Sequence, residues 1–266
     1  LVNLEGKEYL YYKTVAPNVA FIRATTCDSE GYATFEDEVM YLDALVIAEA
    51  VHNNGGIVMM QVQKMVKKAT PHPKAVRIPG YLVDIVVVDP AQTQLYGGAP
   101  VNRFISGDFT LDDSERVKIP LNQRKVVARR ALYEMKKGAI GNVGVGIADG
   151  IGLVAREEGC DEDFVLTVET GPIGGITTQG VAFGANVNTR AILDMTAQFD
   201  FYHGGGLDVC YLSFAEVDQH GNVNVHKFNG KIMGTGGFID ISATSRKIVF
   251  CGTVSYTHLR AHETKA

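Results

Sequence analysis

The sequence lacks long apolar runs and closely spaced cysteines. No apolar stretch reaches the roughly 18 residues that a membrane-spanning helix requires, which argues against a membrane protein. No CxxC pair is present, so we expect neither a disulfide framework nor a zinc site. The four cysteines are widely spaced, and we expect them to be reduced, mostly buried thiols of a cytosolic protein: Cys27, Cys160, Cys210 and Cys251.

A surplus of positive charge is also missing. The chain has 25 Lys and Arg against 30 Asp and Glu, a net charge of −5, which argues against a nucleic-acid-binding surface. The 266 residues are 46% hydrophobic and 21% charged. This composition is typical of an ordinary globular chain with one large or two medium domains. A GxSxG motif is absent as well, which leaves a serine hydrolase without support.

One glycine-rich stretch has nearly the spacing of a dinucleotide-binding site: Gly144-Val-Gly146-Ile-Ala-Asp-Gly150. The pattern is GxGxxxG rather than GxGxxG, and no acidic residue ends a clear second strand about 20 residues further on. We therefore expect no NAD site. The better interpretation is a close turn between a strand and a helix.

The first part of the chain predicts alternating strands and helices. Val19–Thr25, Ile57–Gln63 and Leu82–Asp89 are apolar and rich in β-branched residues, which predicts strands. The last two are nearly continuous in such residues, which is typical of strands that are buried on both faces. Leu42–His52 has the pattern of an amphipathic helix, which Asn53-Asn54-Gly55 would end.

The second part begins after a stretch, 96–120, that is rich in Gly, Pro, Asp and Ser and that we interpret as a linker. A helix is expected next, with Asn122 as its N-cap. The residues that define it are Val127, Ala131 and Met135 on one face, Lys136 and Lys137 in the last turn, and Gly138 beyond it. A strand at Ile140–Val145, a helix near Gly150–Glu158 and a strand at Phe164–Val168 should follow.

An internal repeat supports two similar α/β units. The sequence that starts at Val19 aligns with the sequence that starts at Val209. Each has the pattern of an apolar strand followed by Asp-x-x-Gly and a second extended stretch. Asp28 and Asp218 are the two turn residues, since Asp bonds the backbone ahead of it and Gly tolerates positive φ. Identity between the copies is low, and chance similarity of two α/β units is the alternative.

A carboxylate at the end of a buried strand is the most informative feature of the chain. The apolar run Phe164–Val168 ends on Glu169, and the chain then turns at once through Gly171, Gly174 and Gly175. Glycines let a backbone turn sharply and let its N–H groups approach a ligand closely. A lone Glu at a strand end is usually a solvated charge, so the surrounding sequence decides the interpretation.

That surrounding sequence resembles the family I CoA-transferases, specifically the acetate/propionate type. The stretch VETGPIGG around Glu169 resembles the catalytic ExGxxGG motif of that family. Three more stretches match in the family's order, and the matching text runs from about Leu1 to Thr253: GGIVMMQVQKMVKKAT, FDFYHGGGLDVCYLSFAEVDQHGNVNV and GTGGFIDI. Four ordered matches are far more specific than one motif.

The resemblance implies a fold of two similar open α/β domains with an active site in the cleft between them. On this view residues 1–106 are the C-terminal part of a truncated first domain and 107–121 are the linker. Residues 122–253 form the second domain, which carries Glu169. The last stretch, 254–266, resembles translated sequencing-adapter read-through and is expected to be a non-native tail. The chain would then be an incomplete fragment, and its start at Leu1 rather than Met agrees with that expectation.

The resemblance also implies a mechanism. Glu169 would attack a short-chain acyl-CoA and form a glutamyl-CoA thioester in a ping-pong reaction that passes coenzyme A to a free carboxylate. Glycine N–H groups would bind the substrate, and the candidates for cofactor binding are Gly171, Gly174, Gly175, Gly234, Gly236 and Gly237. The stretch Gly144–Gly150 would line the CoA channel. No metal and no tightly bound cofactor are expected, because coenzyme A and acyl-CoA are substrates.

The expected partners are acyl-CoA and short-chain carboxylates, with no nucleic acid and no membrane. We also expect a cytoplasmic homo-oligomer. Two alternatives remain open from the sequence. An acyl-CoA hydrolase on the same scaffold needs only water admitted to the acyl-enzyme, and a CoA-binding relative would have lost its activity. Retention of Glu169 with its glycine turn argues against the second.

Overall fold

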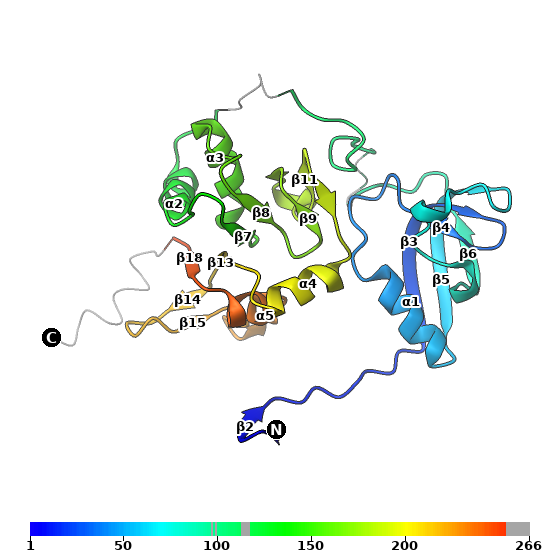
Figure 1. Ribbon diagram of the computed structural model, residues 1–266, viewed down its shortest axis with the longest axis horizontal. Coiled ribbons are helices and arrows are strands. Elements are labelled where there is room, and N and C mark those ends of the chain that lie inside the picture. The colour runs from blue at the N-terminus through cyan, green and yellow to red at the C-terminus, as the bar shows by residue number, and fades with distance from the viewer. Residues whose placement is uncertain (97, 99, 113–117, 254–266) are drawn as a thin grey trace. The chain divides into compact units, whose positions relative to one another are not determined.

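The computed structural model describes residues 1–96, 98, 100–112 and 118–253 (Figure 1). The expected tail 254–266 and part of the expected linker therefore lie outside the described residues. The chain divides into two compact units. The first comprises Leu1–Glu36 and Asp43–Gln92, and the second comprises Asp37–Leu42 and Thr93–Ala266. The assignment of family domains made from the sequence remains a prediction.

The first unit is built on a four-stranded sheet. Its elements are β1 Val2–Leu4, β2 Lys7–Tyr9, β3 Val19–Asp28, β4 Ala33–Thr34, α1 Ala44–Asn53, β5 Ile57–Val66, η1 Pro73–Ala75, η2 Gly80–Leu82 and β6 Ile85–Val88. The sheet order is β4-β3-β5-β6. Strands β3, β5 and β6 are parallel, β4 is antiparallel to β3, and α1 connects β3 to β5 (Figure 1).

Burial of the central strands on both faces was expected, and that prediction is wrong for this chain. Val58, Met60 and Val62 are fully buried on one face of β5, but Ile85 and Val87 of β6 are 43% and 49% exposed. Helix α1 packs against β3 and β5 on one face. Among the described residues of this unit, no helix covers the other face.

Two element boundaries in this unit also differ from expectation. The predicted strand Leu82–Asp89 is shorter, because Gly80–Leu82 forms a 3-10 turn and β6 begins only at Ile85. The predicted helix at Leu42 begins at Ala44. Leu42 has φ of +51° and its carbonyl accepts the N–H of Met195, so it belongs to the second unit.

The second unit is built on a six-stranded sheet in the order β12-β9-β8-β7-β13-β18. Its strands are β7 Ile140–Val143, β8 Val165–Thr167, β9 Pro172–Ile173, β12 Ala191–Ile192, β13 Val209–Ser213 and β18 Ile248–Cys251. Strands β8, β7, β13 and β18 are mutually parallel, whereas β9 and β12 at the edge are antiparallel to their neighbours. Three two-stranded ladders lie outside the sheet: β10 Ile176–Thr177 with β11 Asn186–Val187, β14 Glu216–Val217 with β15 Val223–Asn224, and β16 Lys227–Phe228 with β17 Lys231–Ile232.

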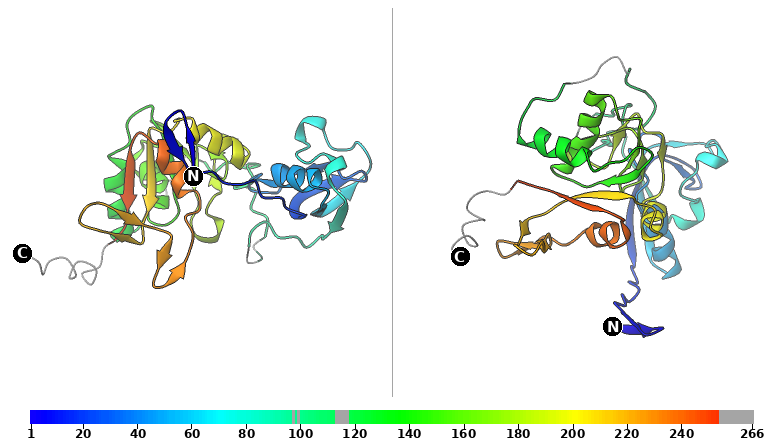
Figure 2. Two further views of the ribbon diagram at one scale, coloured as in Figure 1. Left: turned by 90° about the horizontal axis from the view of Figure 1, so that it is seen from below. Right: turned by 60° about the vertical axis from the view of Figure 1, so that its left-hand side comes forward.

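Helices pack on both faces of this sheet (Figure 2). They are α2 Gln123–Leu132, α3 Ile151–Glu158, α4 Met195–His203 and α5 Phe238–Thr244, with 3-10 turns η3 Ala148–Gly150 and η4 Gly180–Ala182. Helices α2 and α3 share one core with Val143, Leu166 and Tyr211. Helices α4 and α5 share a second core with Cys210 and Leu212. Because neighbouring residues of β13 lie in different cores, the two helix pairs cover opposite faces.

The predicted N-cap of α2 is confirmed, and its predicted end is wrong. The Asn122 side chain accepts the N–H of Lys125 at 2.9 Å. The helix ends at Leu132, and the next residues bond only three positions back, which tightens the chain into turns. Gly138 then donates to the carbonyl of Asp163. Met135 and the two lysines after it therefore lie beyond the helix.

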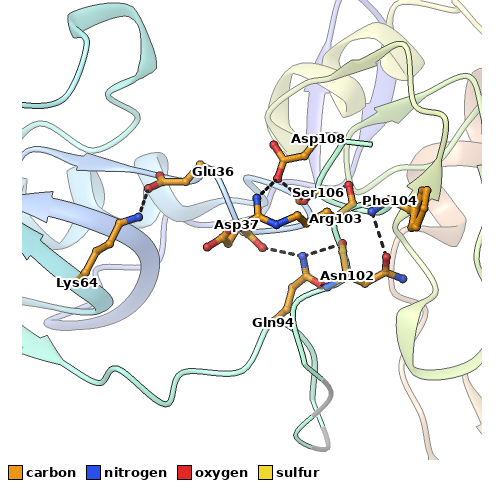
Figure 3. Close-up of polar contacts among 9 residues, drawn as sticks. All are labelled: Glu36, Asp37, Lys64, Gln94, Asn102, Arg103, Phe104, Ser106 and Asp108. Carbon is orange, nitrogen blue, oxygen red and sulfur yellow. Dashed lines mark hydrogen bonds and ion pairs between the residues drawn. The ribbon is translucent and has the colours of Figure 1, made fainter. Parts of the chain in front are cut away.

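A short segment between the two parts of the first unit packs into the second. The Gln94 side chain is buried and donates to the carbonyls of Asp37 and Asn102 at 2.8 and 3.3 Å (Figure 3). Val39 packs there with Ile105 and Ala185. The stretch 96–120, interpreted as a linker, thus contains one buried residue among those described, Ile105, and this residue packs against Val39.

The expected burial of most cysteines is confirmed. Cys27, Cys210 and Cys251 are buried, Cys160 is half-buried, and all four are free. None of the helices in the described ranges is long and apolar enough to cross a membrane.

The turn that follows β3 occurs twice in the chain. The Oδ1 of Asp28 accepts the N–H groups two and four residues ahead at 2.9 and 3.0 Å. The Oδ1 of Asp218 accepts the corresponding N–H groups at 2.8 and 2.9 Å. Gly31 and Gly221 take φ of +85° and +82°. The two Asp-x-x-Gly stretches of the predicted repeat therefore form the same turn.

The first copy of this turn should contribute more to stability than the second. Asp28 is 2% exposed, and its Oδ2 also accepts the N–H of Ala69 at 2.9 Å. Burial by itself raises the pKa of Asp28, but three backbone N–H donors and Lys68 hold the pKa below its usual value. Its stabilising effect is therefore present above the unfolded-state pKa and is lost as pH falls through the folded-state pKa.

We predict that Asp28→Ala lowers the free energy of unfolding at neutral pH by about 3 kcal/mol, because three donors lose a charged acceptor in a buried place. Asp218→Ala is the matched control. Asp218 is half-buried, and water replaces its bonds, so the loss should be smaller. Chemical denaturation of both variants tests this difference, and equal losses would contradict it.

Candidate active site

Glu169 lies at the carboxyl end of β8, in a turn that reverses the chain. Val168 is fully buried. Its N–H donates to the carbonyl of Pro172, and its carbonyl accepts the N–H of Gly171, which closes the turn tightly. Thr167 faces the α4 side of the sheet, because its neighbour Leu166 lies in the α2–α3 core. In open α/β sheets, ligands bind outside the carboxyl ends of the parallel strands, and Glu169 is at such an end.

The carboxyl group of Glu169 is half-buried and is bonded to the Asn142 amide. The Nδ2 of Asn142, a fully buried residue of β7, lies 3.3 Å from Oε2 of Glu169. Burial raises the pKa of Glu169 above its usual value, and hydrogen bonds from its own backbone N–H and from Asn142 oppose this change only in part. The carboxylate form is thus incompletely solvated, and Asn142 is the side-chain donor directed at it.

Behind Asn142 lies a fully buried polar cluster. The Tyr202 hydroxyl, from α4, is 3.2 Å from Nδ2 of Asn142, 2.8 Å from Oγ1 of Thr167 and 2.9 Å from Nε2 of Gln198. Thr167 in turn donates to the carbonyl of Gly141 at 3.0 Å. Burial raises the pKa of Tyr202 to about 12, so this hydroxyl keeps its proton at neutral pH.

The glycines after Glu169 are explained by backbone packing. Gly171 has φ of +122°, and a Cβ there would collide with the carbonyl oxygen of Leu193. Gly175 has φ of +74°, and its Cβ would collide with the carbonyl of Val187. The N–H of Gly174 donates to Leu166 at 2.7 Å, and that of Gly171 is bonded within the turn. Contact of these N–H groups with substrate remains a prediction.

The second glycine loop lies against the helix that carries Tyr202. Gly237 precedes α5, and a Cβ on it would lie 2.8 Å from the ring of Phe199 in α4. Gly234 and Gly236 have φ of +79° and +52°, with open space where a side chain would point. The structure therefore leaves this loop uncrowded, and its role in binding an anion or the pantetheine arm remains a prediction.

The stretch Gly144–Gly150 forms the expected close turn between a strand and a helix. The N–H of Gly144 donates to the carbonyl of Tyr211 at 2.8 Å. Asp149 is buried and accepts from Gln179 and Arg124 at 2.6 and 3.3 Å. Within the described ranges no group of three or more His, Cys, Asp or Glu side chains could hold a metal ion.

Sequence reasoning missed the residues that surround the Glu169 carboxyl. Asn142 interrupts a buried strand with a polar side chain, and Thr167 is its direct neighbour in the β7–β8 ladder. Gln198 and Tyr202 are four residues apart on α4, so they face the same way. A buried polar side chain needs a partner. The polar residue inside the apolar stretch at Ile140–Val143 was therefore the available signal.

Comparison with known proteins identifies relatives of the chain. A family model described as coenzyme A transferase matches residues 1–89. Acetate CoA-transferase YdiF of Escherichia coli K12 is 85% identical over 264 residues, 99% of this chain and 50% of that protein. Caffeate CoA-transferase of Acetobacterium woodii is 40% identical over 260 residues, 95% of this chain and 50% of that protein.

A solved structure gives the same result for the fold. The acyl-CoA transferase YdiF of E. coli O157:H7, crystallised as a thioester complex with CoA, superposes with a TM-score of 0.87. It is 84% identical, and the match covers 95% of this chain and 49% of that one. The α/β fold that the sequence resemblance implied is thereby confirmed. The chain spans about half the length of these relatives.

The raised pKa of Glu169 predicts that this carboxylate destabilises the fold. Its folded-state pKa lies above the unfolded value of about 4.5, so the cost is full above the folded-state pKa and disappears as pH falls below the unfolded value. Glu169→Gln keeps the shape and removes the charge. We expect it to raise the melting temperature at pH 7, with a gain that shrinks toward pH 4.

Thermal unfolding across this pH range, with Glu49→Gln as the control, is the measurement. Glu49 is an exposed glutamate of α1, so the same change there should leave the melting temperature nearly constant at both pH values. A lower melting temperature for Glu169→Gln at pH 7 would show that the carboxylate is stabilised rather than strained.

Proposed function

Because the chain belongs to the coenzyme A transferase family, we propose that it carries the covalent site of an enzyme that transfers coenzyme A from a short-chain acyl-CoA to a free carboxylate. The observation that carries this proposal is the half-buried Glu169 carboxyl with the Asn142 amide on one oxygen. The thioester complex of the 84% identical relative supports a covalent intermediate. The experiments proposed for the full-length protein use this chain extended to the length of these relatives.

The first half-reaction forms two covalent species in turn. Oε1 of Glu169, the oxygen that Asn142 does not contact, attacks the acyl carbon of the thioester, and the CoA thiolate leaves. The product is a mixed anhydride between Glu169 and the acyl group. The thiolate then attacks Cδ of Glu169, and the first carboxylate leaves. A glutamyl-CoA thioester remains on the enzyme, and no net oxidation has occurred.

The second half-reaction reverses these steps with a new acid. The acceptor carboxylate attacks Cδ of Glu169 and displaces the thiolate, which gives a second anhydride. The thiolate attacks the acceptor's acyl carbon, and the Glu169 carboxylate is restored. Thioester energy is conserved throughout, because an anhydride and a thioester interconvert without water. Holding the thiolate beside the anhydride supplies on the order of 7–11 kcal/mol of the barrier through proximity.

Asn142 would act on the oxygen where charge develops. When Oε1 has formed the new bond, Oε2 becomes a carbonyl oxygen, and each attack on Cδ turns it into an oxyanion. The Asn142 Nδ2 already lies 3.3 Å from this atom in a fully buried place. One such donor is worth roughly 3–4 kcal/mol in comparable sites. Asn142 therefore stabilises both tetrahedral intermediates on Glu169.

The finer parts of the proposal follow the resemblance. Acetate and propionate are the proposed acids, and the name of the 85% identical relative, an acetate CoA-transferase, supports acetate. Coenzyme A enters as a substrate and not as a tightly bound cofactor. A cytoplasmic homo-oligomer is the proposed form. An assay of the full-length protein across acetate, propionate, butyrate, lactate and acetoacetate would rank the acceptors.

We predict that Glu169→Asp in the full-length protein lowers kcat by about 100-fold, because the shorter side chain withdraws the nucleophile by about 1 Å. Glu169→Ala should show no transfer. Glu162→Asp is the matched control, since Glu162 is an exposed glutamate in the loop before β8. Near-normal transfer by both Glu169 variants would overturn the assignment of the nucleophile.

The covalent intermediate gives an independent prediction. When the full-length protein receives acetyl-CoA without an acceptor, peptide mass spectrometry should locate coenzyme A on Glu169, and the steady-state kinetics should be ping-pong. Acyl-CoA consumption should require added carboxylate. Consumption at the same rate without carboxylate would identify a hydrolase, and intersecting kinetic patterns with no adduct would refute the mechanism.

Asn142→Ala should lower kcat by about 100-fold, because it removes the single side-chain donor that the described residues direct at Oε2. The KM for acyl-CoA should change little, since the bond strengthens mainly in the transition state. Steady-state kinetics of the full-length variant measure both constants. An effect confined to KM would assign Asn142 to substrate binding.

A further inference from the structure

The hydrogen-bond directions in the cluster behind Asn142 can be deduced one after another. The Thr167 hydroxyl donates its only hydrogen to the carbonyl of Gly141 at 3.0 Å. The Tyr202 hydroxyl lies 2.8 Å from the same Thr167 oxygen. Because Thr167 has no second hydrogen, Tyr202 must be the donor in this contact. The one proton of Tyr202 is therefore committed to Thr167.

The hydrogen bond from Tyr202 to Thr167 determines which end of the Asn142 amide faces the Tyr202 oxygen. With its proton used, the Tyr202 oxygen can only accept, and it does so from Nε2 of Gln198 at 2.9 Å and Nδ2 of Asn142 at 3.2 Å. A reversed Asn142 amide would place Oδ1 against this oxygen with no hydrogen between them. The Asn142 amide is thus held with its NH2 group toward Tyr202, and the second N–H hydrogen points to Glu169.

The orientation of Asn142 is imposed on it from outside. Among the residues that the structure describes, none donates to Oδ1 of Asn142, although that oxygen is buried. A buried acceptor without a partner is energetically costly. The hydrogen bonding of the Asn142 oxygen therefore does not explain the observed orientation of the amide. The Tyr202 oxygen and the Glu169 carboxylate both require a donor and together enforce it.

We propose that Tyr202, with Gln198 and Thr167 fixing its hydroxyl, is a positioning residue that keeps the Asn142 N–H directed at Glu169. The proposal rests on the proposed function, in which that N–H stabilises the oxyanion on Glu169. The Tyr202 hydroxyl is fully buried and bonds Asn142, Thr167 and Gln198, so it acts on Glu169 through Asn142. Without the Tyr202 oxygen, the Glu169 carboxylate alone favours this orientation, and the Asn142 amide rotates more easily away from it.

The experiment compares two buried tyrosines in the full-length protein. Tyr202→Phe should lower kcat by about 10-fold and leave the KM values of both substrates within about twofold, since the lost orientation affects the charged intermediate. Tyr211→Phe is the matched control. Tyr211 is also fully buried, and no described residue bonds its hydroxyl, so kcat should stay within about twofold. Equal kcat values for Tyr202→Phe and the unmodified protein would overturn the proposal.

A double-mutant cycle tests whether Tyr202 acts through Asn142. Once Asn142→Ala is present, adding Tyr202→Phe should change kcat by less than about twofold, because the residue it orients is gone. A full additional 10-fold loss would mean that Tyr202 supports the site by general packing, and the proposal would fail. Thermal unfolding of each variant separates loss of fold from loss of rate.

Thr167→Val provides a second route if Tyr202→Phe does not fold. The change is close in shape, but it removes the acceptor that holds the Tyr202 proton, which Tyr202 can then donate to Oδ1 of a reversed Asn142. Thr167→Val should lower kcat by the same factor as Tyr202→Phe. When Asn142→Ala is already present, adding Thr167→Val should not lower kcat further. An unchanged kcat in Thr167→Val would overturn the proposal.

The covalent adduct keeps the two levels of inference separate. If the unmodified full-length protein forms the coenzyme A adduct on Glu169 and the Tyr202 and Thr167 variants form it equally fast, only the positioning role is refuted. If the unmodified protein forms no adduct on Glu169, the proposed function fails and the positioning role with it. Rapid-quench measurement of adduct formation gives both results.

Discussion

One hydrogen bond, from the Asn142 amide to the Glu169 carboxyl, connects the fold to its chemistry. A carboxyl group that is partly removed from water is less stable as an anion, and the Asn142 amide, together with the backbone N–H of Glu169 itself, offsets part of that cost. For the proposed mechanism, the donor must come from a rigid element so that it stays in place through each covalent intermediate. Strand β7 supplies it, because Asn142 is fully buried in the centre of the six-stranded sheet.

The parallel sheet makes this contact geometrically simple. Asn142 and Thr167 are direct partners in the β7–β8 ladder, so their side chains leave the sheet on the same face. Helix α4 covers that face and brings Tyr202 over both. The turn after β8 then returns Glu169 to the same side. The proposed nucleophile, its hydrogen-bond donor and the proposed support of that donor therefore come from three neighbouring elements of one unit.

Sequence reasoning identified the features that depend on local chemistry. Glu169 at a strand end, the Asn122 cap and the two Asp turns are each determined by residues within a few positions of one another. Features that depend on distant residues were missed. The end of α2 is determined by where Gly138 meets Asp163, and the Tyr202 cluster requires knowledge of which helix covers β7.

The exposed face of the first sheet shows a different limit. The apolar pattern of Ile85–Val88 is typical of a strand that is covered on both faces. The pattern does not show which other segments pack against those faces. Within the described residues of this unit only one side is covered, so Val87 stays 49% exposed. Periodicity in one segment cannot show which other segment supplies the covering layer.

The repeated Asp turn has a consequence for how the gene tolerates change. The two copies have the same backbone bonds. Asp28 is 2% exposed, and its second oxygen accepts the backbone N–H of Ala69, whereas the second oxygen of the half-buried Asp218 accepts from the exposed Asn222 side chain. Substitutions at the two aspartates should therefore be tolerated unequally. Replacement of Asp218 leaves most of the turn solvated and is tolerated better than replacement of the buried Asp28, so relatives should vary far more at Asp218 than at Asp28.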